Sequence, residues 1–274
     1  MRAAPAGLLV LLMLGLKGEL SNAAEIVPNI YVGKTITTGT SEEHRPAALA
    51  KCFIDVLVKA SGDPRLATNG SAAAMAEHAA TFVKSLRYRD RLEGRPIHDE
   101  QGTRDRPHDL TVEFEPSQID GALQSLGSRP WTAERPKIAM IVFVRFGEAS
   151  YILTQSEPRG ENQREALQAA SDRIGVPVAL PRLTGIASNN APIDPTAALT
   201  FKEAEELAST LGVDRVVTGS MIFSDEAQGW IAKWRLHEPA GTAQWQVTGV
   251  NYDEAFRVAL RGAAQILSGN GRPL

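Results

Sequence analysis

The sequence predicts an α+β protein in which an N-terminal α+β unit is followed by an α/β domain with a mixed sheet and crossover helices. Three observations lead to this fold class. Apolar residues recur at three- and four-residue spacing in several segments, which is typical of amphipathic helices. Runs rich in β-branched and aromatic residues lie between those segments and indicate strands. In the second part of the chain the two patterns alternate, and this order favours parallel strands joined by helical crossovers.

The N-terminal α+β domain is expected over residues 24–128. Its first helix is expected over 41–61, where Thr40 or Ser41 can cap the start and Gly62 can end the helix. Ser71 is expected to cap a second helix whose apolar face reaches Val83. The other expected elements are a strand over 26–36, two strands between 86 and 115 separated by a polar loop at 94–109, and a helix over 117–126.

The C-terminal α/β domain is expected over residues 137–268, after a connection at 127–136 that two prolines stiffen. Its first strand, at 138–146, is a continuous β-branched and aromatic run of the kind that is buried on both faces. Asp253 is expected to cap the last helix. The remaining expected strands are 176–180, 215–222, 230–237 and 243–250, and the expected helices are 162–174, 200–211 and 253–267.

Residues 1–23 have the order of a cleavable signal peptide: a basic start, an apolar run from Gly7 to Leu16, and a small-residue site at 21–23. We therefore expect an exported protein. No later apolar run approaches the roughly 20 residues of a membrane helix, so no transmembrane segment is expected in the mature chain. Cys52 is the only cysteine, so stability is expected to come from packing rather than from a disulfide.

The charge balance argues against nucleic acid as a partner, because the formal net charge is −3. The same balance predicts little attraction to anionic lipid. The sequence contains no phosphate-binding glycine loop or dinucleotide fingerprint, so no cofactor is expected. The oligomeric state does not follow from the pattern.

The motif Val56-Leu-Val-Lys-Ala-Ser-Gly-Asp63 resembles a bacterial family of exported proteins known as Domain of Unknown Function 2066. Further matches are Pro130-Trp131 with Arg135-Pro136, and the stretch 164–181 that ends in Gly175-Val-Pro-Val-Ala-Leu-Pro181. This resemblance implies export to the periplasm of a Gram-negative bacterium and no established activity. The segment 211–220 is similar to part of an α/β domain of envelope proteins such as the Tol-system translocation protein, and those domains mostly bind other proteins.

Two sets of residues are candidates for binding a partner. Ser61 and Asp63 lie in the family motif, where the simplest interpretation is a helix end followed by a turn. Trp230, Trp234 and Trp245 are expected on one face of two paired strands, because residues four apart on a strand point to the same side. Those three side chains either fill the core or form an exposed platform for a glycan or a partner protein.

The densest group of potential metal ligands lies in the polar loop and includes His98, Asp99, His108 and Asp109. Imidazole and carboxylate suit zinc or manganese. Their spacing matches no tight helical or knuckle template, and Arg104 and Arg106 would repel a cation, so a solvated loop is the simpler interpretation.

The leading hypothesis is a non-enzymatic periplasmic protein that binds components of the cell envelope. Two alternatives stay open at this point. One is a metal-dependent hydrolase that uses the His98–Asp109 loop, and the other is a protein that binds a small ligand in a cleft between the two domains.

Overall fold

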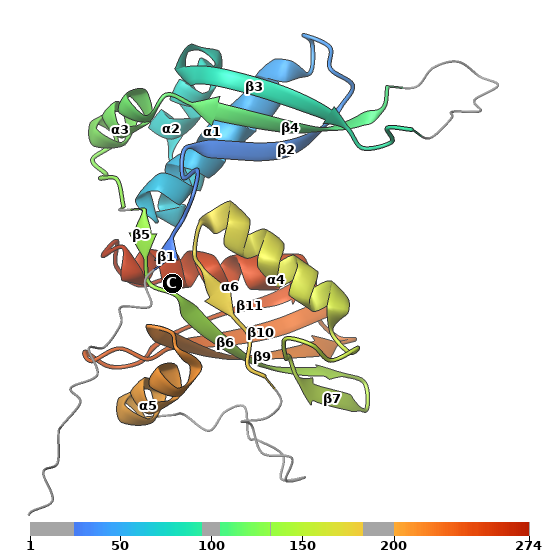
Figure 1. Cartoon of the computed structure of the whole chain (residues 1–274), viewed down its shortest axis with the longest axis vertical. Coiled ribbons are helices and arrows are strands. Elements are labelled where there is room, and N and C mark those ends of the chain that lie inside the picture. Colours follow the sequence, from blue (N-terminus) through green and yellow to red (C-terminus); the bar gives the residue numbers. More distant parts are fainter. Residues whose placement is uncertain (1–24, 95–104, 132, 183–199, 274) are drawn as a thin grey trace, which may run out of the picture.

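The computed structural model describes residues 25–94, 105–131, 133–182 and 200–273. The expected signal peptide and the loop residues His98 and Asp99 lie outside these ranges. We call residues 25–131 the N-terminal half and residues 133–273 the C-terminal half, and Figure 1 shows one above the other. Within the described ranges, no helix has the length and apolar character needed to cross a membrane.

The N-terminal half is a three-stranded antiparallel sheet, in the order β2-β4-β3, with helices packed on one face. Figure 1 shows α1 passing behind the strands. The core between sheet and helices contains Phe53 of α1 and Leu110, Val112 and Phe114 of β4. The elements are β2 (Val32–Thr38), α1 (Arg45–Ser61), α2 (Gly70–Ala76), β3 (Val83–Asp90), β4 (Pro107–Phe114) and α3 (Pro116–Ser125), with 3₁₀ turns at Pro64–Thr68 and Ala79–Phe82.

Helix α1 ends where the sequence predicts, because Gly62 adopts a left-handed φ of 71° and its N–H donates to the Val58 carbonyl. The predicted start is wrong. The N-cap is His44, without a side-chain capping bond, and Pro46 lies in the first turn, where the fixed φ of proline suits a helix start. The predicted cap Ser71 is also wrong, since Oδ1 of Asn69 accepts the bond from the Ala72 N–H at 3.0 Å.

The expected continuation of the second helix to Val83 is not formed. Helix α2 ends at Ala76, and a 3₁₀ turn and strand β3 replace the rest. The apolar residues still point inward, and the ring centroids of Phe82 and Phe53 are 4.7 Å apart. Because a 3₁₀ turn repeats every three residues, its apolar spacing imitates that of a helix over so short a stretch.

The C-terminal half contains a mixed six-stranded sheet in the order β11-β10-β9-β6-β7, with β8 also paired to β6. Strand β6 runs parallel to β8 and β9, which confirms the predicted crossover connections. The elements are β6 (Ile138–Phe146), β7 (Ala149–Ile152), α4 (Glu161–Ile174), β8 (Val178–Ala179), α5 (Phe201–Leu211), β9 (Arg215–Ser224), β10 (Gly229–Leu236), β11 (Ala243–Val250) and α6 (Tyr252–Leu267).

Helices cover both faces of this sheet. Helices α4 and α6 lie on one face and α5 on the other, as Figure 1 shows. Alternate residues of β6 serve the two layers: Met140 and Val142 pack in the core with α4 and α6, whereas Ala139 packs with α5. The sequence pattern missed β7, a four-residue strand that pairs with β6 after a turn at Gly147. Asn251 caps α6 in place of the predicted Asp253.

Glycine 219 of β9 allows the largest fully buried side chain, Trp234, to lie flat on the neighbouring strand. A Cβ at Gly219 would clash with the six-membered ring of that indole. We expect Gly219→Ala to lower the free energy of unfolding by about 1–3 kcal/mol, because a buried ring cannot move aside cheaply. Urea unfolding followed by tryptophan fluorescence measures the change. The control is Gly121→Ala at an exposed position of α3, where an added Cβ meets nothing within 4 Å. Equal urea midpoints for the two variants would contradict the close packing of Trp234 on Gly219.

Candidate functional site

The two halves meet around the side chain of Arg135, which is fully buried at 0% exposure. Arg135 lies in β5 (Glu134–Arg135), which pairs antiparallel with β1 (Glu25–Ile26). Its Nη2 donates to the Lys59 carbonyl at 2.6 Å, and its Nη1 donates to the carbonyls of Gly175 at 2.7 Å and Ile174 at 3.3 Å. The guanidinium also lies 4.1 Å from the ring centroid of Trp131. One buried cation therefore bonds to both halves.

These carbonyls belong to the C-terminal ends of two helices, α1 in the N-terminal half and α4 in the C-terminal half. The last carbonyls of a helix lack partners within the helix and carry its partial negative charge, so a cation there is stabilised. Burial lowers the pKa of Arg135 to about 10, which leaves it charged at neutral pH. Gly175 makes the approach possible, since a Cβ there would lie 2.6 Å from Nη1 of Arg135.

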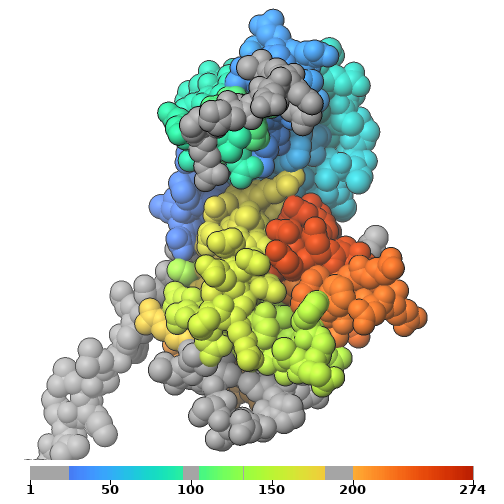
Figure 2. All heavy atoms as spheres, turned by 90° about the vertical axis from the view of Figure 1, so that its right-hand side faces the viewer, coloured from blue at the N-terminus to red at the C-terminus, as the bar shows by residue number. Residues whose placement is uncertain are grey.

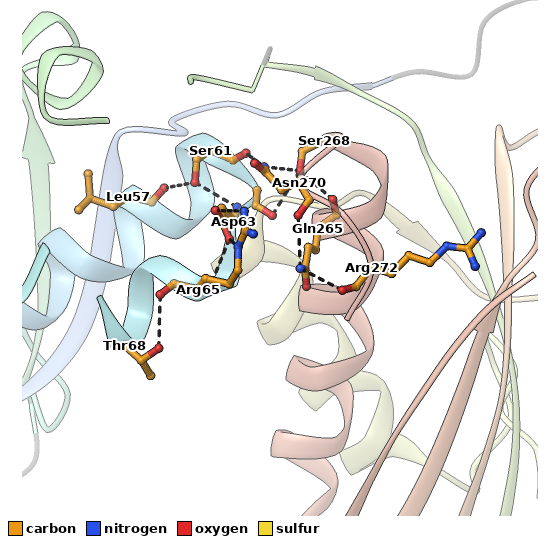
Figure 3. Close-up of polar contacts among 10 residues, drawn as sticks. Leu57, Ser61, Asp63, Arg65, Thr68, Gln265, Ser268, Asn270 and Arg272 are labelled. Carbon is orange, nitrogen blue, oxygen red and sulfur yellow. Dashed lines mark hydrogen bonds and ion pairs between the residues drawn. The ribbon is translucent and has the colours of Figure 1, made fainter. Parts of the chain in front are cut away.

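The predicted partner-binding residues Ser61 and Asp63 lie in the same junction and are buried (Figure 3). The Ser61 hydroxyl donates to the Leu57 carbonyl at 2.7 Å and accepts from the Asp63 N–H at 3.0 Å. The Asp63 carboxylate accepts three bonds from Arg65, one from its backbone N–H and two from its guanidinium. These contacts form a helix end and a turn, which is the simpler of the two interpretations.

The residues after α6 complete the junction (Figure 3). The Asn270 amide donates to the Ser61 carbonyl at 2.9 Å, and the Ser268 hydroxyl donates to the Gly62 carbonyl at 3.3 Å. A Cβ at Gly62 would lie 2.6 Å from the Ser268 side chain. The Ser61–Asp63 motif is therefore engaged with the chain's own C-terminal segment and offers no exposed edge to another molecule.

The three predicted tryptophans form no exposed platform. Trp230, Trp234 and Trp245 are 6%, 0% and 5% exposed and lie in the core of the C-terminal half. Trp234 is directly opposite Trp245 across the β10–β11 pair, as the strand pattern predicts. The Trp245 indole N–H donates to the Val258 carbonyl of α6 at 3.1 Å. Helix α6 packs on this face of the sheet. The spacing of residues within a strand cannot show whether a distant helix buries that face.

The predicted metal ligands are not brought together within the described residues, where no group of three potential ligands occurs. His108 and Asp109 are neighbours on β4, so their side chains point to opposite faces of the sheet. The Asp109 carboxylate forms ion pairs with Arg89 at 2.6 Å and Arg91 at 3.4 Å. His98 and Asp99 lie outside the described residues.

A cleft of about 670 Å³, lined by both charged and apolar residues, lies between the halves, beside the Arg135 junction. The N-terminal half contributes β1, the start of β2 and the outer side of α1, and the C-terminal half contributes the end of α4 and the strand that follows it. Figure 2 shows α4, in yellow, directly beneath the N-terminal half. The charged residues of the lining are Glu25, Lys34, Asp55, Lys59, Lys137, Asp172 and Arg173.

Among these charged groups, Lys59 has a shifted pKa. Its Nζ donates to the Val32 carbonyl at 2.9 Å. Burial, together with the nearby positive charges of Lys34 and Arg135, lowers the pKa of Lys59 to about 8, although Asp55 and Asp172 act in the opposite direction. No acidic side chain forms a salt bridge with this amine within the described residues. A negative group that entered the cleft would therefore raise the pKa of Lys59 and keep the amine charged to higher pH.

An ion pair spans the cleft from one half to the other. The Arg173 guanidinium of α4 donates to both carboxylate oxygens of Asp55 of α1 at 2.7 and 2.8 Å. Lys51 also donates to Asp55 at 2.9 Å. Asp172, next in sequence to Arg173, is exposed and accepts a single side-chain bond, from Gln168 at 2.9 Å. Positively and negatively charged side chains therefore line the same cleft.

Sequence reasoning missed Lys59, Arg135, Asp55 and Arg173, which lie on separate elements. A weak signal was present, since Lys59 and Arg135 are inside the motifs quoted for the family resemblance. The sequence also carried a periodic signal, since Lys51, Asp55 and Lys59 recur at four-residue spacing and so form a charged stripe along α1.

The fold and the cleft define a mixed α+β protein with a polar site between two halves. A family model, Domain of unknown function (DUF8605), matches residues 24–132. The match covers the N-terminal half, including the Lys59 side of the cleft. No curated protein and no solved structure matches the chain.

Replacing Arg135 tests whether the junction depends on this buried guanidinium. We expect Arg135→Met to lower the free energy of unfolding by roughly 3 kcal/mol or more, since each buried carbonyl left without a donor costs about 1–3 kcal/mol. Urea unfolding measures the loss. Arg129→Met, at an exposed position of the preceding connection, is the matched control. A loss below about 1 kcal/mol for Arg135→Met would show that water replaces these bonds at little cost.

The lowered pKa of Lys59 predicts a specific pH dependence of stability. Between pH about 8 and the ordinary lysine value of 10.5, the folded state releases a proton that the unfolded state still holds. The penalty for burying the charge is therefore present below pH 8 and disappears as pH rises. We expect the unfolding free energy of the wild type, measured relative to Lys59→Met, to rise across this window. Lys202→Met, at an exposed position of α5, should give a difference in unfolding free energy that does not change with pH. If the difference for Lys59→Met is also independent of pH, the charge of Lys59 is not buried in the folded state.

Proposed function

We propose that this protein is an exported, non-enzymatic binding protein of the bacterial cell envelope that takes a small anionic or zwitterionic ligand into the cleft between its halves. The observation that carries the proposal is the Lys59 side of the cleft. A partly buried amine with a lowered pKa lies near Lys34, and neither amine forms a salt bridge within the described residues. The proposed export to the cell envelope rests on the signal-peptide pattern in residues 1–23 and on the resemblance to Domain of Unknown Function 2066.

The size and the walls of the cleft support binding of a small molecule. A volume of about 670 Å³ lies within the range of roughly 300–1,000 Å³ that is typical of ligand pockets. Both walls are held firmly, by the Asp55–Arg173 ion pair and by the bonds of Arg135. A preformed site loses little free energy in ordering itself around a ligand.

The charges of the lining favour a ligand with a carboxylate or phosphate. Lys34 and Lys59 supply the positive side, and a positively charged group on the same ligand would find Asp172 close by, since the charge of Asp172 acts on Lys59. Free amino acids, short peptides, dicarboxylates and sugar phosphates are the classes that fit. A glycan on a tryptophan platform is not proposed, because the three indoles are buried.

A thermal-shift screen with those four ligand classes tests the proposal. We expect at least one class to raise the melting temperature and Lys59→Met to remove the shift, whereas Lys202→Met keeps it. Affinity should fall as pH rises above about 8, because the neutral Lys59 amine no longer attracts an anion. Titration calorimetry in buffers of different ionisation enthalpy should detect proton uptake on binding at pH 8.

Two results would refute the proposed site. One is a ligand whose shift survives Lys59→Met and Lys34→Met together, since that ligand binds elsewhere. The other is an absence of any shift across all four classes at millimolar concentration.

A further inference from the structure

One face of the N-terminal sheet carries a segregated positive charge. The cross-strand register places Lys34 of β2 and Arg87 of β3 on either side of Thr111, and Ile36 and Arg89 on either side of Asp109. Lys84 and Arg91 lie at the ends of β3 on the same side, since Lys84 pairs with Glu113 and Arg91 with Asp109. We call this surface the basic face, with the charged members Lys34, Lys84, Arg87, Arg89, Arg91, Asp109 and Glu113.

The basic face is the side of the sheet that faces away from the helices. Helices α1, α2 and α3 pack against the alternate residues of β4, namely Leu110, Val112 and Phe114. Lys34 and Arg87 are exposed, and Ile36 is 57% exposed at the middle of the face. Antiparallel sheets commonly leave one face in water, but an aliphatic side chain among cations on that face has no structural role in the core.

The acidic groups neutralise only part of this charge. Asp109 is paired with Arg89 and Arg91, and Glu113 is paired with Lys84 at 2.7 Å. Lys34 and Arg87 form no ion pair within the described residues. On the strands of this face five cations thus meet two carboxylates, with Glu93 acting on Arg89 and Glu115 on Lys84 from the ends of the strands, on a chain whose formal net charge is −3. The net charge of the whole chain predicts little attraction to anionic lipid. That single value does not show the local excess of positive charge on the basic face.

The dimensions of the face favour a membrane over a folded partner. Three strands of seven or eight residues present roughly 300 Å². A stable protein interface takes about 800 Å² from each partner and needs matched shape. A lipid headgroup surface needs neither, since basic side chains bind its phosphates and one aliphatic side chain enters the interface.

We propose that the basic face docks the protein on the surface of an anionic lipid bilayer, with Lys34 and Arg87 contacting phosphates and Ile36 entering the headgroup region. This surface is separate from most of the proposed ligand cleft, although Lys34 belongs to both. The association is peripheral and depends on salt, because exposed charges are screened within about 8 Å at physiological ionic strength.

Co-sedimentation with vesicles tests the proposal. The purified full chain is mixed with vesicles of phosphatidylcholine alone or with 30 mole per cent phosphatidylglycerol, the latter at low and at high salt. Each cation near an anionic surface raises partitioning by about fivefold. We expect at least tenfold stronger binding to the phosphatidylglycerol vesicles, and we expect most of it to disappear in high salt.

Variants locate the surface. Arg87→Glu alone, which leaves the cleft untouched, should lower binding to anionic vesicles at least tenfold, and Ile36→Ser should lower it severalfold without changing its salt dependence. Arg129→Glu makes the same charge change at an exposed position outside the basic face and should have a much smaller effect. Circular dichroism confirms folding, and Arg87→Gln replaces Arg87→Glu if the latter unfolds.

Three outcomes would overturn the proposal. They are equal binding to both vesicle types, an equal loss for Arg129→Glu and Arg87→Glu, and binding to soluble polyglutamate without binding to vesicles. The last outcome would assign the face to an acidic polypeptide. None of them bears on ligand binding in the cleft, which is measured without lipid.

Discussion

The structure depends on one buried guanidinium. Arg135 lies where the C-terminal ends of α1 and α4 converge, and it donates to carbonyls of both. Without a cation there, two sets of helix-end carbonyls would face each other with the same sign of partial charge and without donors. The spacing of the halves, and hence the width of the cleft between them, follows from the reach of this side chain. Gly175 is required at the contact because a larger residue would hold the guanidinium away.

Most of the secondary structure could be predicted from the sequence because each element carries its own local signal. The run Ile138–Phe146 and the strand Ala243–Val250 have the predicted bounds, since the first is a β-branched run buried on both faces and the second begins with alternating buried and exposed residues. Neither signal requires knowledge of the neighbouring elements. The alternation of strands and helices in the C-terminal half also predicted the parallel pairing, because a helix between two strands favours a crossover connection. The helix starts were less predictable, because several polar residues near each start can cap it. The N-caps are His44 rather than Thr40 or Ser41, and Asn69 rather than Ser71.

The site could not be predicted in the same way, because exposure is a property of the whole fold. The indoles of Trp230 and Trp234 have the spacing of a surface platform, and only the position of α6 shows that they are buried. Ser61 and Asp63 have the chemistry of a binding edge, yet residues 268–270 occupy that position. The cleft residues Asp55 and Arg173 are 118 positions apart in the chain, and no local pattern relates them.

The contacts of Asn270 and Ser268 with the end of α1 also constrain the order of assembly. They join positions more than 200 residues apart, so these two bonds can form only after the residues that follow α6 have been synthesised. Before that point the carbonyls of Ser61 and Gly62 lack these two donors. The segment after α6 therefore joins the two halves at the end of α1 only once α6 is in place.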